Sequence, residues 1–386
     1  MSRWHSWLRS ATDMISGYKG NEPFPFFAKQ YFSRHKQAGS KDRRHISQLC
    51  YCYFRAAKAF RDQPVERAIL LGYFLCSTEP SEQLAATEPG WNEKTHLSIR
   101  EKLAFLDLKI SLEDFFPAEM LSDTIDKEEF LNSIFIQPDL FLRLRPGYED
   151  LVKKKLESAG ISYKEISASC LSLPNSSRID NVIELDKEAV VQDLSSQRIG
   201  ELLSGAGVTF SKAWDCCAGS GGKSILLKDI FPGIALTVSD IRPAILQNLA
   251  KRFYAAGISR YKCITVDLVK ADLGTQDEFD CILADLPCTG SGTWGRSPEQ
   301  LFYFKQQKII EYTALQKKIL TKVIPHLLPG GYLVYITCSV FKKENEEMIA
   351  WINQESGLRT IKMEVLKGYH TKADTLFATL LEKPLP

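Results

Sequence analysis

The sequence predicts a multidomain protein of the α + α/β class: an all-α N-terminal domain, a small α+β module and a C-terminal doubly wound α/β domain. Three observations support this prediction. The chain has 386 residues, which is too long for one ordinary hydrophobic core. Apolar residues recur at helical spacing from about residue 24 to 130, and from about residue 212 apolar strands alternate with helical segments. The predicted boundaries are 1–132, 133–192 and 193–386.

The first predicted domain, residues 1–132, is helical. Ile46, Leu49, Tyr53 and Ala57 recur at the spacing of one helix face. Turn sequences such as TEPSEQ and TEPGWNE separate the helical stretches. We therefore expect several short helices that pack around a shared core.

Charge is distributed unevenly within this helical part. Residues 1–62 hold twelve Lys and Arg against four Asp and Glu, whereas residues 63–130 hold six against fourteen. The basic part is also rich in aromatic residues, and this mixture suits a phosphate backbone with bases available for stacking. A solvated helical surface over an aromatic core explains the same composition equally well. The stretch alone leaves both interpretations open.

The second predicted module, residues 133–192, begins with a strand. In DLFLRLRP, Leu140, Leu142 and Leu144 alternate with Arg143 and Arg145, which predicts one buried face and one wet, basic face. A short helix follows and ends at Gly160, and the pieces SCLSLP and NVIELD are expected to be further strands. The pattern indicates a small α+β insert with a basic face.

The third predicted domain, residues 193–386, has a strand–loop–helix rhythm. Its strands are KAWDCC, GIALTVSD, YKCITVD, FDCILADLPC and GGYLVYITCS, which are nearly continuous apolar runs and favour a parallel sheet covered on both faces. The longest helix is expected to begin at RSPEQ with Ser297 as its cap and to bury Leu315, Ile319, Val323 and Leu327. The pieces LRTIKMEV and TLFATLLEK lack a long helix between them and predict an antiparallel edge.

A glycine turn, CAGSGGKS at residues 217–224, follows the first strand of this sheet. A phosphate-binding Walker loop needs Gly at the position of Cys217, and a dinucleotide fingerprint needs Gly at the position of Ser224, so both interpretations are weak. The remaining interpretation is a tight turn that lets a nucleoside cofactor approach the backbone.

Carboxylates stand at the ends of four successive predicted strands. Asp215, Asp240, Asp267 and Asp285 occupy these positions, and ligands of doubly wound sheets bind at the carboxyl ends of the strands. A single Asp there is usually a cap or a turn residue, but four in register favour a nucleoside. S-adenosylmethionine carries no phosphate and needs a close backbone approach, a carboxylate for its ribose and acids near its cationic sulfonium. The sequence supplies these groups.

Two cysteines, Cys288 and Cys338, are expected at the ends of neighbouring strands. Carbon 5 of cytosine becomes nucleophilic when a thiolate adds to carbon 6, and a base must later remove the carbon 5 proton. A reactive Cys, a carboxyl group and a further acid or base suffice. Buried cysteines are more often small apolar residues, and we assign Cys263 and Cys281, inside apolar runs, to that class. Residue types alone do not decide which thiol is the nucleophile.

Five motifs resemble those of RNA cytosine-5 methyltransferases in the correct order: DCCAGSGGKS, VSD, TVD, ADLPCTGSGTWGRSPE and YITCSVFKKENEEMI. The resemblance is greatest to the bacterial small-subunit (16S) ribosomal RNA methyltransferase B group of the NOL1/NOP2/Sun family. It covers residues 190–386, while GSKDRRHISQLCYCYFR resembles a NusB-like RNA-binding domain and residues 135–190 an RRM-like module. The turn departs from many relatives at Gly219 and Ser220, and Gly295 replaces a common Arg.

The resemblance implies a Rossmann-like catalytic domain that forms 5-methylcytosine in RNA and converts S-adenosylmethionine to S-adenosylhomocysteine. It implies Cys338 as the nucleophile and Cys288 as the residue that assists product release, with Asp285 also placed to bond the cytosine ring. The implied cofactor-binding residues are Cys217, Ala218, Gly219, Ser220, Gly221, Gly222, Lys223, Asp240, Asp267 and Asp285.

Composition and spacing set the remaining expectations. The longest uncharged apolar stretch, Ala68–Cys76, is too short to cross a membrane, and the N-terminus lacks an apolar secretory signal, so we expect a cytoplasmic protein. The cysteines lack the C-x-x-C spacing of zinc sites, so we expect no metal. We further expect a monomer that acts on ribosomal RNA, with tRNA or another RNA as the alternative substrate. A non-catalytic RNA-binding or ribosome assembly factor is the more distant alternative.

Overall fold

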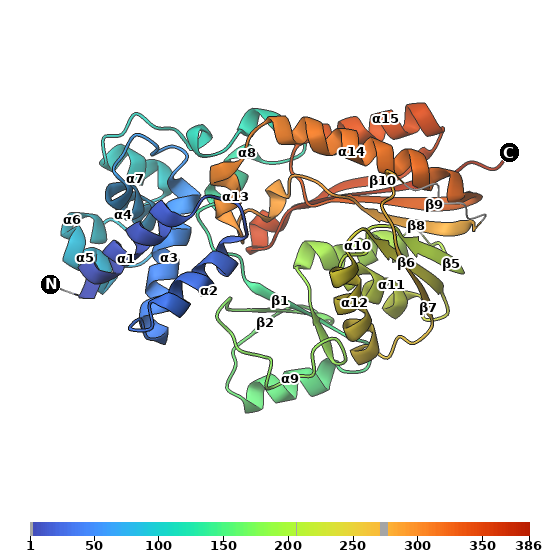
Figure 1. Ribbon diagram of the computed structural model, residues 1–386, viewed down its shortest axis with the longest axis horizontal. Helices are drawn as coiled ribbons and strands as arrows, with labels where there is room; N and C mark the ends of the chain where they lie inside the picture. The colour runs from blue at the N-terminus through green and yellow to red at the C-terminus, as the bar shows by residue number, and fades with distance from the viewer. Residues whose placement is uncertain (1–2, 206, 271–276) are drawn as a thin grey trace. The chain divides into compact units, whose positions relative to one another are not determined.

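The computed structural model describes residues 3–205, 207–270 and 277–386. The chain forms two compact units (Figure 1). The first contains the described residues up to Leu121 together with Asp126–Gln137 and Thr293–Lys305. The second contains Ser122–Ile125, Pro138–Gly292 and Gln306–Pro386. No helix in the described part of the chain is long and apolar enough to cross a membrane.

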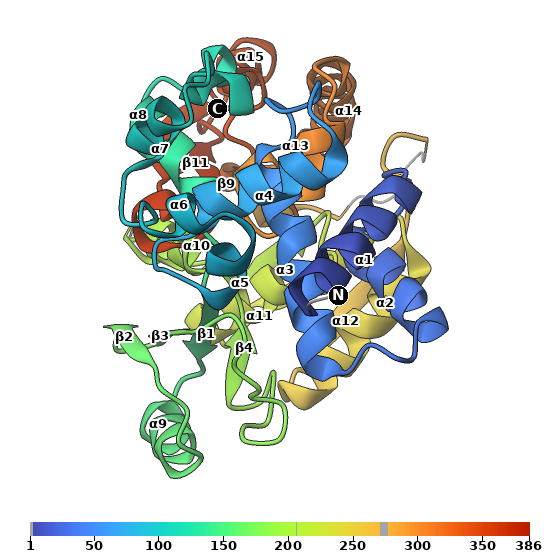
Figure 2. The ribbon, with the colours of Figure 1, turned by 90° about the vertical axis from the view of Figure 1, so that its left-hand side faces the viewer.

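The first unit is helical, as predicted. Its longer helices are α1 (Arg3–Gly17), α2 (Phe24–Arg34), α3 (Ser40–Ala56) and α4 (Val65–Cys76), followed by the short α5 (Glu82–Thr87), α6 (Pro89–Asn92), α7 (Ile99–Phe105) and α8 (Lys127–Ser133). Helices α3 and α4 pack closely at Gly72. A Cβ at this position would lie only 2.4 Å from the Cys52 carbonyl oxygen, so only glycine allows this approach. Figure 2 shows α4 crossing α3.

One segment of this helical unit comes from far along the chain. The short helix α13 (Pro298–Tyr303) packs on α3, and its orange ribbon lies among the blue helices in Figure 2. Tyr303 donates its hydroxyl hydrogen to the Tyr18 carbonyl oxygen at 2.9 Å, and Arg55 donates to the Gly295 carbonyl oxygen at 2.7 Å. The residues after the predicted Cys288 motif are thereby part of the helical core.

The second unit contains a four-stranded antiparallel sheet with the order β2-β3-β1-β4. The strands are β1 (Leu140–Leu144), β2 (Lys164–Ser167), β3 (Cys170–Leu173) and β4 (Ala189–Val191), with α9 (Glu149–Ser158) beside them. Leu142 and Leu144 of β1 pack against Val152 and Leu156 of α9. This confirms the predicted first strand and the SCLSLP strand.

Two expectations for this module are wrong. NVIELD forms turns, with Leu185 in an isolated bridge, and the strand comes later as β4. The predicted wet face of β1 is also absent, because Arg143 is 5% exposed and pairs with Asp229 of the following domain. Arg145 pairs with the same carboxylate at 2.7 Å. These two cations face another part of the same unit, so they do not form an exposed basic surface.

The second sheet has seven strands in the order β10-β11-β9-β8-β5-β6-β7. Its strands β5 (Lys212–Asp215), β6 (Ala235–Asp240), β7 (Tyr261–Thr265), β8 (Phe279–Asp285) and β9 (Leu327–Thr337) run parallel. Strands β10 (Arg359–Leu366) and β11 (Leu376–Glu382) are antiparallel, as predicted. Helices α10 (Leu194–Ser204), α11 (Gly222–Ile230) and α12 (Pro243–Ala255) cover one face, while α14 (Gln307–Val323) and α15 (Glu346–Ser356) cover the other (Figure 1).

The long helix predicted from RSPEQ is interrupted. It divides into α13 and α14, and Ser297 makes no side-chain cap bond. Helix α14 ends at Val323 because Pro325, two residues on, lacks the N–H that an α-helix needs. Leu327 consequently begins β9 and does not extend the helix.

The expectation that Cys263 is buried is wrong. Cys263 is exposed because β7 is the edge strand of the sheet, whereas Cys281 is fully buried as expected.

Candidate active site

The carboxyl ends of the parallel strands surround a cavity of about 590 Å³ within the second unit. Its walls come from the glycine turn, from the ends of β5, β6 and β8, from the loops that follow them, and from α14. The structure brings together nearly all residues predicted for the site. Those that line the cavity are Cys217, Ala218, Gly219, Ser220, Gly222, Lys223, Asp240, Asp267, Asp285, Cys288 and Cys338. Gly221 alone of the predicted set lies behind this wall.

The role of Gly221 is to shape the turn. Its φ is +82°, a conformation that side chains rarely adopt, and a Cβ would lie 2.7 Å from Phe253 Cε1 and 2.9 Å from Leu249 Cγ. Helix α11 begins at the next residue, Gly222. The turn therefore packs tightly against α12 and presents its other backbone atoms to the cavity.

Asp240, at the end of β6, is held in its charged form. It accepts hydrogen bonds from the Gly219 N–H at 3.0 Å and from Arg242 through both its backbone N–H and its guanidinium. Burial raises the pKa of this carboxyl, but the bonds and charge of Arg242 and the Gly219 bond outweigh burial and lower it below its usual value. A carboxylate in this state accepts hydrogen bonds, as binding of ribose hydroxyls requires.

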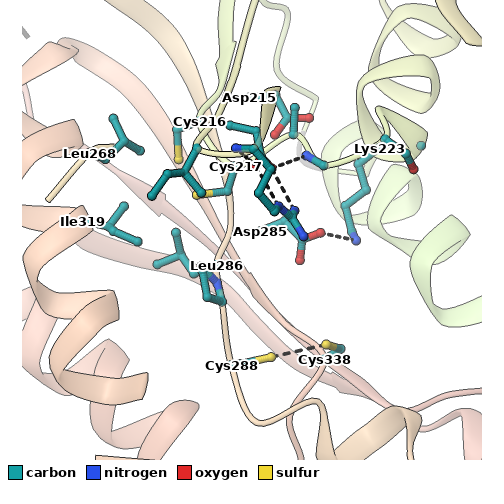
Figure 3. A pocket seen from close by; sticks show the side chains of 18 of the residues that line it. Asp215, Cys216, Cys217, Lys223, Leu268, Asp285, Leu286, Cys288, Ile319 and Cys338 are labelled. Atoms are coloured by element: carbon teal, nitrogen blue, oxygen red, sulfur yellow. Dashed lines mark hydrogen bonds and ion pairs between the residues drawn. The ribbon is translucent and has the colours of Figure 1, made fainter. Parts of the chain in front are cut away.

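A second pair joins the glycine turn to β8. Lys223 Nζ lies 2.6 Å from Asp285 Oδ2, and the two side chains are 16% and 31% exposed (Figure 3). Burial disfavours the charged ammonium, but the charge and hydrogen bond of Asp285, with smaller contributions from Cys338 and Asp215, raise the Lys223 pKa. Lys223 is therefore engaged by a carboxylate of the neighbouring strand.

Asp267 follows β7 and lines the same cavity. Its Oδ1 accepts from the Val269 N–H at 3.0 Å, as a turn carboxylate commonly does, and its Oδ2 lies 3.5 Å from Lys270 Nζ. Asp267 therefore both stabilises the turn after β7 and lines the cavity. Apolar Leu268 and Ile319 also line the cavity, on the side away from Lys223 (Figure 3).

Several lining residues were missed by sequence reasoning. Arg252 of α12 donates to the Ser220 carbonyl oxygen at 3.1 Å and forms a bidentate salt bridge with Asp186. Arg252 thus ties the glycine turn to the loop before β4. No local pattern marks it, because its partners lie 32 and 66 residues away. The other missed lining residues are Val191, Gln192, Ser196, Cys216, Ile241, Arg242, Val266, Leu268, Val269, Leu286, Pro287, Leu315 and Ile319.

The two predicted cysteines are in contact. Cys288 Sγ and Cys338 Sγ lie 3.3 Å apart although they are 50 residues apart in the chain (Figure 3). The hydrogen bond with Cys338, burial, and the charges of Cys338 and Glu344 hold the pKa of Cys288 well above its usual value. Either sulfur can be the donor in this contact, and the assignment of Cys338 as the nucleophile stays a prediction.

Comparison with known proteins agrees with this architecture. Residues 210–378, which contain the glycine turn and both cysteines, match the family described as 16S rRNA methyltransferase RsmB/F.

Over these residues, the chain is similar to the RsmB/F methyltransferase family. This family uses S-adenosylmethionine. The chain is 32% identical over 162 residues to ribosomal RNA small subunit methyltransferase B of Xylella fastidiosa strain 9a5c, which covers 42% of this chain and 38% of that protein. It is 30% identical over 211 residues to the protein of the same name from Shewanella oneidensis, covering 51% and 49%. The chain thus spans between about a third and a half of these two relatives.

Solved structures share the fold of this chain. The crystal structure of PH0851 covers 99% of both chains with a TM-score of 0.72 and 20% identity. NSun6 from Pyrococcus horikoshii, solved with SFG, covers 69% of this chain and 96% of its own, with a TM-score of 0.59 and 14% identity. These likenesses show the Rossmann-like fold of the catalytic domain. The NusB-like and RRM-like descriptions of the other domains, and the three-domain division, stay predictions.

Proposed function

We propose that this protein is an S-adenosylmethionine-dependent RNA methyltransferase that forms 5-methylcytosine in small-subunit (16S) ribosomal RNA. The observation that carries the proposal is the contact of the Cys288 and Cys338 thiols, 3.3 Å apart, in the wall of the cavity lined by the glycine turn. One thiol without a second would not explain both bond formation and release. Two thiols in contact suit a reaction that needs a nucleophile and a proton carrier.

The residues present fit S-adenosylmethionine. A cavity of about 590 Å³ suits a nucleoside-sized ligand, and Asp240 offers carboxylate oxygens for ribose hydroxyls. Asp215, buried at the cavity wall, has one oxygen, Oδ1, that no protein donor reaches. Carboxylates around the cavity also suit the cationic sulfonium. When bound there, the cofactor supplies an electrophilic methyl group.

The chain's own residues perform the remaining chemistry. The Cys338 thiolate adds its electron pair to carbon 6 of cytosine, the carbon 5–carbon 6 double bond opens, and ring nitrogen 3 gains a proton or a strong hydrogen bond from an acid. Carbon 5 then becomes nucleophilic enough to accept the methyl group. Removal of the carbon 5 proton by a base, with Cys288 assisting, restores the double bond and expels Cys338 as a thiolate.

The target base must leave its stack to reach Cys338, because a duplex hides carbon 6 from a protein thiol. Asp285 lies at the end of β8, three residues before Cys288, and lines the same cavity. We assign it a hydrogen bond to the cytosine ring in addition to cofactor contact. Lys223, bonded to its Oδ2, keeps that carboxylate oriented.

The RNA target follows from charge and from the relatives. The curated relatives are named ribosomal RNA small subunit methyltransferase B, and residues 1–62 of this chain combine excess Lys and Arg with aromatics. We propose that the N-terminal part contacts RNA and that the protein works as a monomer in the cytoplasm. Within the described residues, no group of three or more His, Cys, Asp or Glu is placed to hold a metal ion.

The test measures transfer of a radiolabelled methyl group from S-adenosylmethionine to RNA by the full chain, followed by bisulfite sequencing of total RNA from cells with and without the gene. We expect one cytosine in small-subunit ribosomal RNA to lose protection when the gene is absent. If only a tRNA cytosine loses its protection from bisulfite conversion, the substrate is tRNA and the proposed chemistry still holds. Absence of label on every RNA class, naked or in ribosomal particles, would leave a non-catalytic assembly factor.

A further inference from the structure

A buried glutamate lies beneath both cysteine loops. Glu344 is 0% exposed and ends the short 3-10 helix Lys342–Glu344, between β9 and α15. Its Oε1 accepts from the Thr289 N–H at 2.9 Å, and its Oε2 accepts from the Thr289 and Ser339 hydroxyls, both at 2.5 Å. Thr289 directly follows Cys288, and Ser339 directly follows Cys338. One carboxylate therefore binds the residue after each thiol.

A second layer fixes Glu344 itself. The Gln316 side-chain amide of α14 donates to the Pro287 carbonyl oxygen at 2.9 Å and to Glu344 Oε1 at 3.5 Å. Tyr335 of β9 donates its hydroxyl hydrogen to the Glu344 backbone oxygen at 2.6 Å. Helix α14 thereby contacts the carboxylate, and strand β9 holds the backbone of Glu344.

Burial raises the pKa of the Glu344 carboxyl, and the hydrogen bonds from Ser339, Thr289 and Gln316 oppose this shift and favour the charged form. All four contacts to its side chain come from groups that donate: one backbone N–H, two hydroxyls and one amide. A carboxylate is an acceptor-only group with room for about four such bonds, whereas a protonated carboxyl would need an acceptor for its own hydrogen. Charge-assisted bonds of this kind offset the cost of burying the anion.

We propose that Glu344 is a positioning residue that holds the Cys288 and Cys338 loops in thiol contact and, through its negative charge, keeps the proton on Cys288. This inference rests on the proposed function. It explains how two adjacent thiols take opposite parts, because the negative charge of Glu344 disfavours a second negative charge on Cys288. Cys338 remains the thiol that attacks carbon 6.

Other titratable groups around Cys288 do not supply this asymmetry. Cys338 follows β9, Tyr335 lies on β9 and Tyr312 on α14, and the pKa of each tyrosine is raised, first by burial and then by neighbours that include Cys288. Both phenols are therefore neutral. Lys223 is paired with Asp285. The pKa of Cys288 is raised first by its bond to Cys338 and by burial, and the charge of Glu344 adds to both.

The experiment compares Glu344→Gln with the control Glu347→Gln, an exposed glutamate three residues later. Glutamine keeps the shape of the Glu344 side chain but removes its charge. Its NH2 group would also face the Thr289 and Ser339 donors. In the free protein, iodoacetamide labelling followed over pH by mass spectrometry reports each thiol separately. We expect Cys288 in E344Q to react about three- to tenfold faster at pH 8, because one unit of pKa is a tenfold change in thiolate. E347Q should match the wild type.

Kinetics on the full chain separate positioning from folding. E344Q should lower kcat for methyl transfer by at least about tenfold, with KM for RNA and cofactor unchanged. Ser339→Ala removes one of the two loop contacts but keeps the charge, so it should lower kcat without changing Cys288 labelling. If E344Q fails to fold, Ser339→Ala and Thr289→Val decide the positioning claim by kcat.

Two results would overturn the inference: Cys288 labelling and kcat in E344Q equal to those of E347Q, or loop variants with wild-type kcat. A wild-type protein that transfers no methyl group would instead defeat the proposed function. The labelling comparison needs neither RNA nor cofactor, so it would still test the part assigned to Glu344.

Discussion

Lys223 Nζ lies 2.6 Å from Asp285 Oδ2, and this contact joins the glycine turn to the end of the neighbouring strand β8. Both residues line the cavity. The turn and the strand that leads to Cys288 are therefore connected by a partly buried ion pair. Its strength should be measurable in cofactor binding, because each partner orients the other.

Lys223→Met should weaken S-adenosylhomocysteine binding about tenfold. It leaves Asp285 without its cation, and losing one partner of such a pair costs roughly 1–3 kcal/mol, of which about 1.4 kcal/mol corresponds to a factor of ten. Calorimetric titration of K223M, D285N and the double variant should give non-additive losses. Strictly additive losses would contradict a coupled pair. Lys308→Met, which breaks an exposed pair with Glu311, is the control and should leave affinity unchanged.

Exchange of each cysteine should separate their roles. Cys288→Ala should accumulate a covalent protein–RNA adduct, because Cys338 still adds to carbon 6 while release is slow. Cys338→Ala should form no adduct and transfer no methyl group. Denaturing gels of protein incubated with RNA and cofactor show both outcomes. The reverse pattern would make Cys288 the nucleophile, as in DNA cytosine methyltransferases. Cys281→Ala, a buried cysteine outside the cavity lining, should form no stable adduct.

Gly221→Ala should destabilise the catalytic domain and weaken cofactor binding. The φ of +82° disfavours alanine, and its Cβ would lie 2.7 Å from Phe253. Strained backbone of this kind costs about 1–3 kcal/mol, and relief of the clash would shift the turn. Urea denaturation measures the loss of stability. Gly233→Ala is the matched control, since nothing lies within 4 Å of its Cβ and its φ is not positive. Equal midpoints for the two variants would be inconsistent with this account.

Asp215 should make folding stability depend on pH. Burial raises its pKa to about 7 from the model-peptide value of 3.8; the Ser224 bond and Lys223 oppose this, and Asp285 and Asp240 add to it. The folded pKa is above the unfolded one, so the folded state keeps a proton that the unfolded chain releases. Its contribution to the free energy of unfolding is therefore complete below about pH 4 and declines as pH rises to about 7.

Asp215→Asn should remove this dependence. The amide imitates the protonated carboxyl and can still accept from Ser224, so the variant should be more stable than wild type at pH 8 by at most about 4 kcal/mol. Denaturation at pH 4.5, 6 and 8 should show this gain shrinking toward acid. Asp62→Asn, at an exposed position, should show no such trend. A gain that is constant with pH would indicate that Asp215 is ionised in the folded state.

Local sequence patterns predicted the strands and the site motifs well. Apolar runs that end in Asp215, Asp240 and Asp285 predicted β5, β6 and β8, because a buried parallel strand needs a continuous apolar stretch and its polar end marks the ligand edge. The glycine turn and both cysteines also follow strands, so their convergence in one cavity follows from parallel topology. These features depend on neighbours within a few residues.

Local patterns failed where distant partners decided the outcome. Arg143 looked solvent-exposed by alternation, but Asp229, 86 residues away, buries it. Cys263 looked buried within an apolar run, but β7 is an edge strand. Ser297 looked like a helix cap, yet its segment joins the helical unit through contacts with α3. In each case, packing overrode a correct local preference.

Sequence patterns alone were enough to predict the succession of strands along the chain, the chemistry gathered at their ends and the family that residues 210–378 match. The tertiary structure alone decided that Cys288 and Cys338 touch, that Arg252 reaches the glycine turn, and that Glu344 binds both cysteine loops. The physical reason is distance along the chain. Strand and turn preferences arise between near neighbours, whereas these contacts join residues up to 55 positions apart and exist only after the layers have packed.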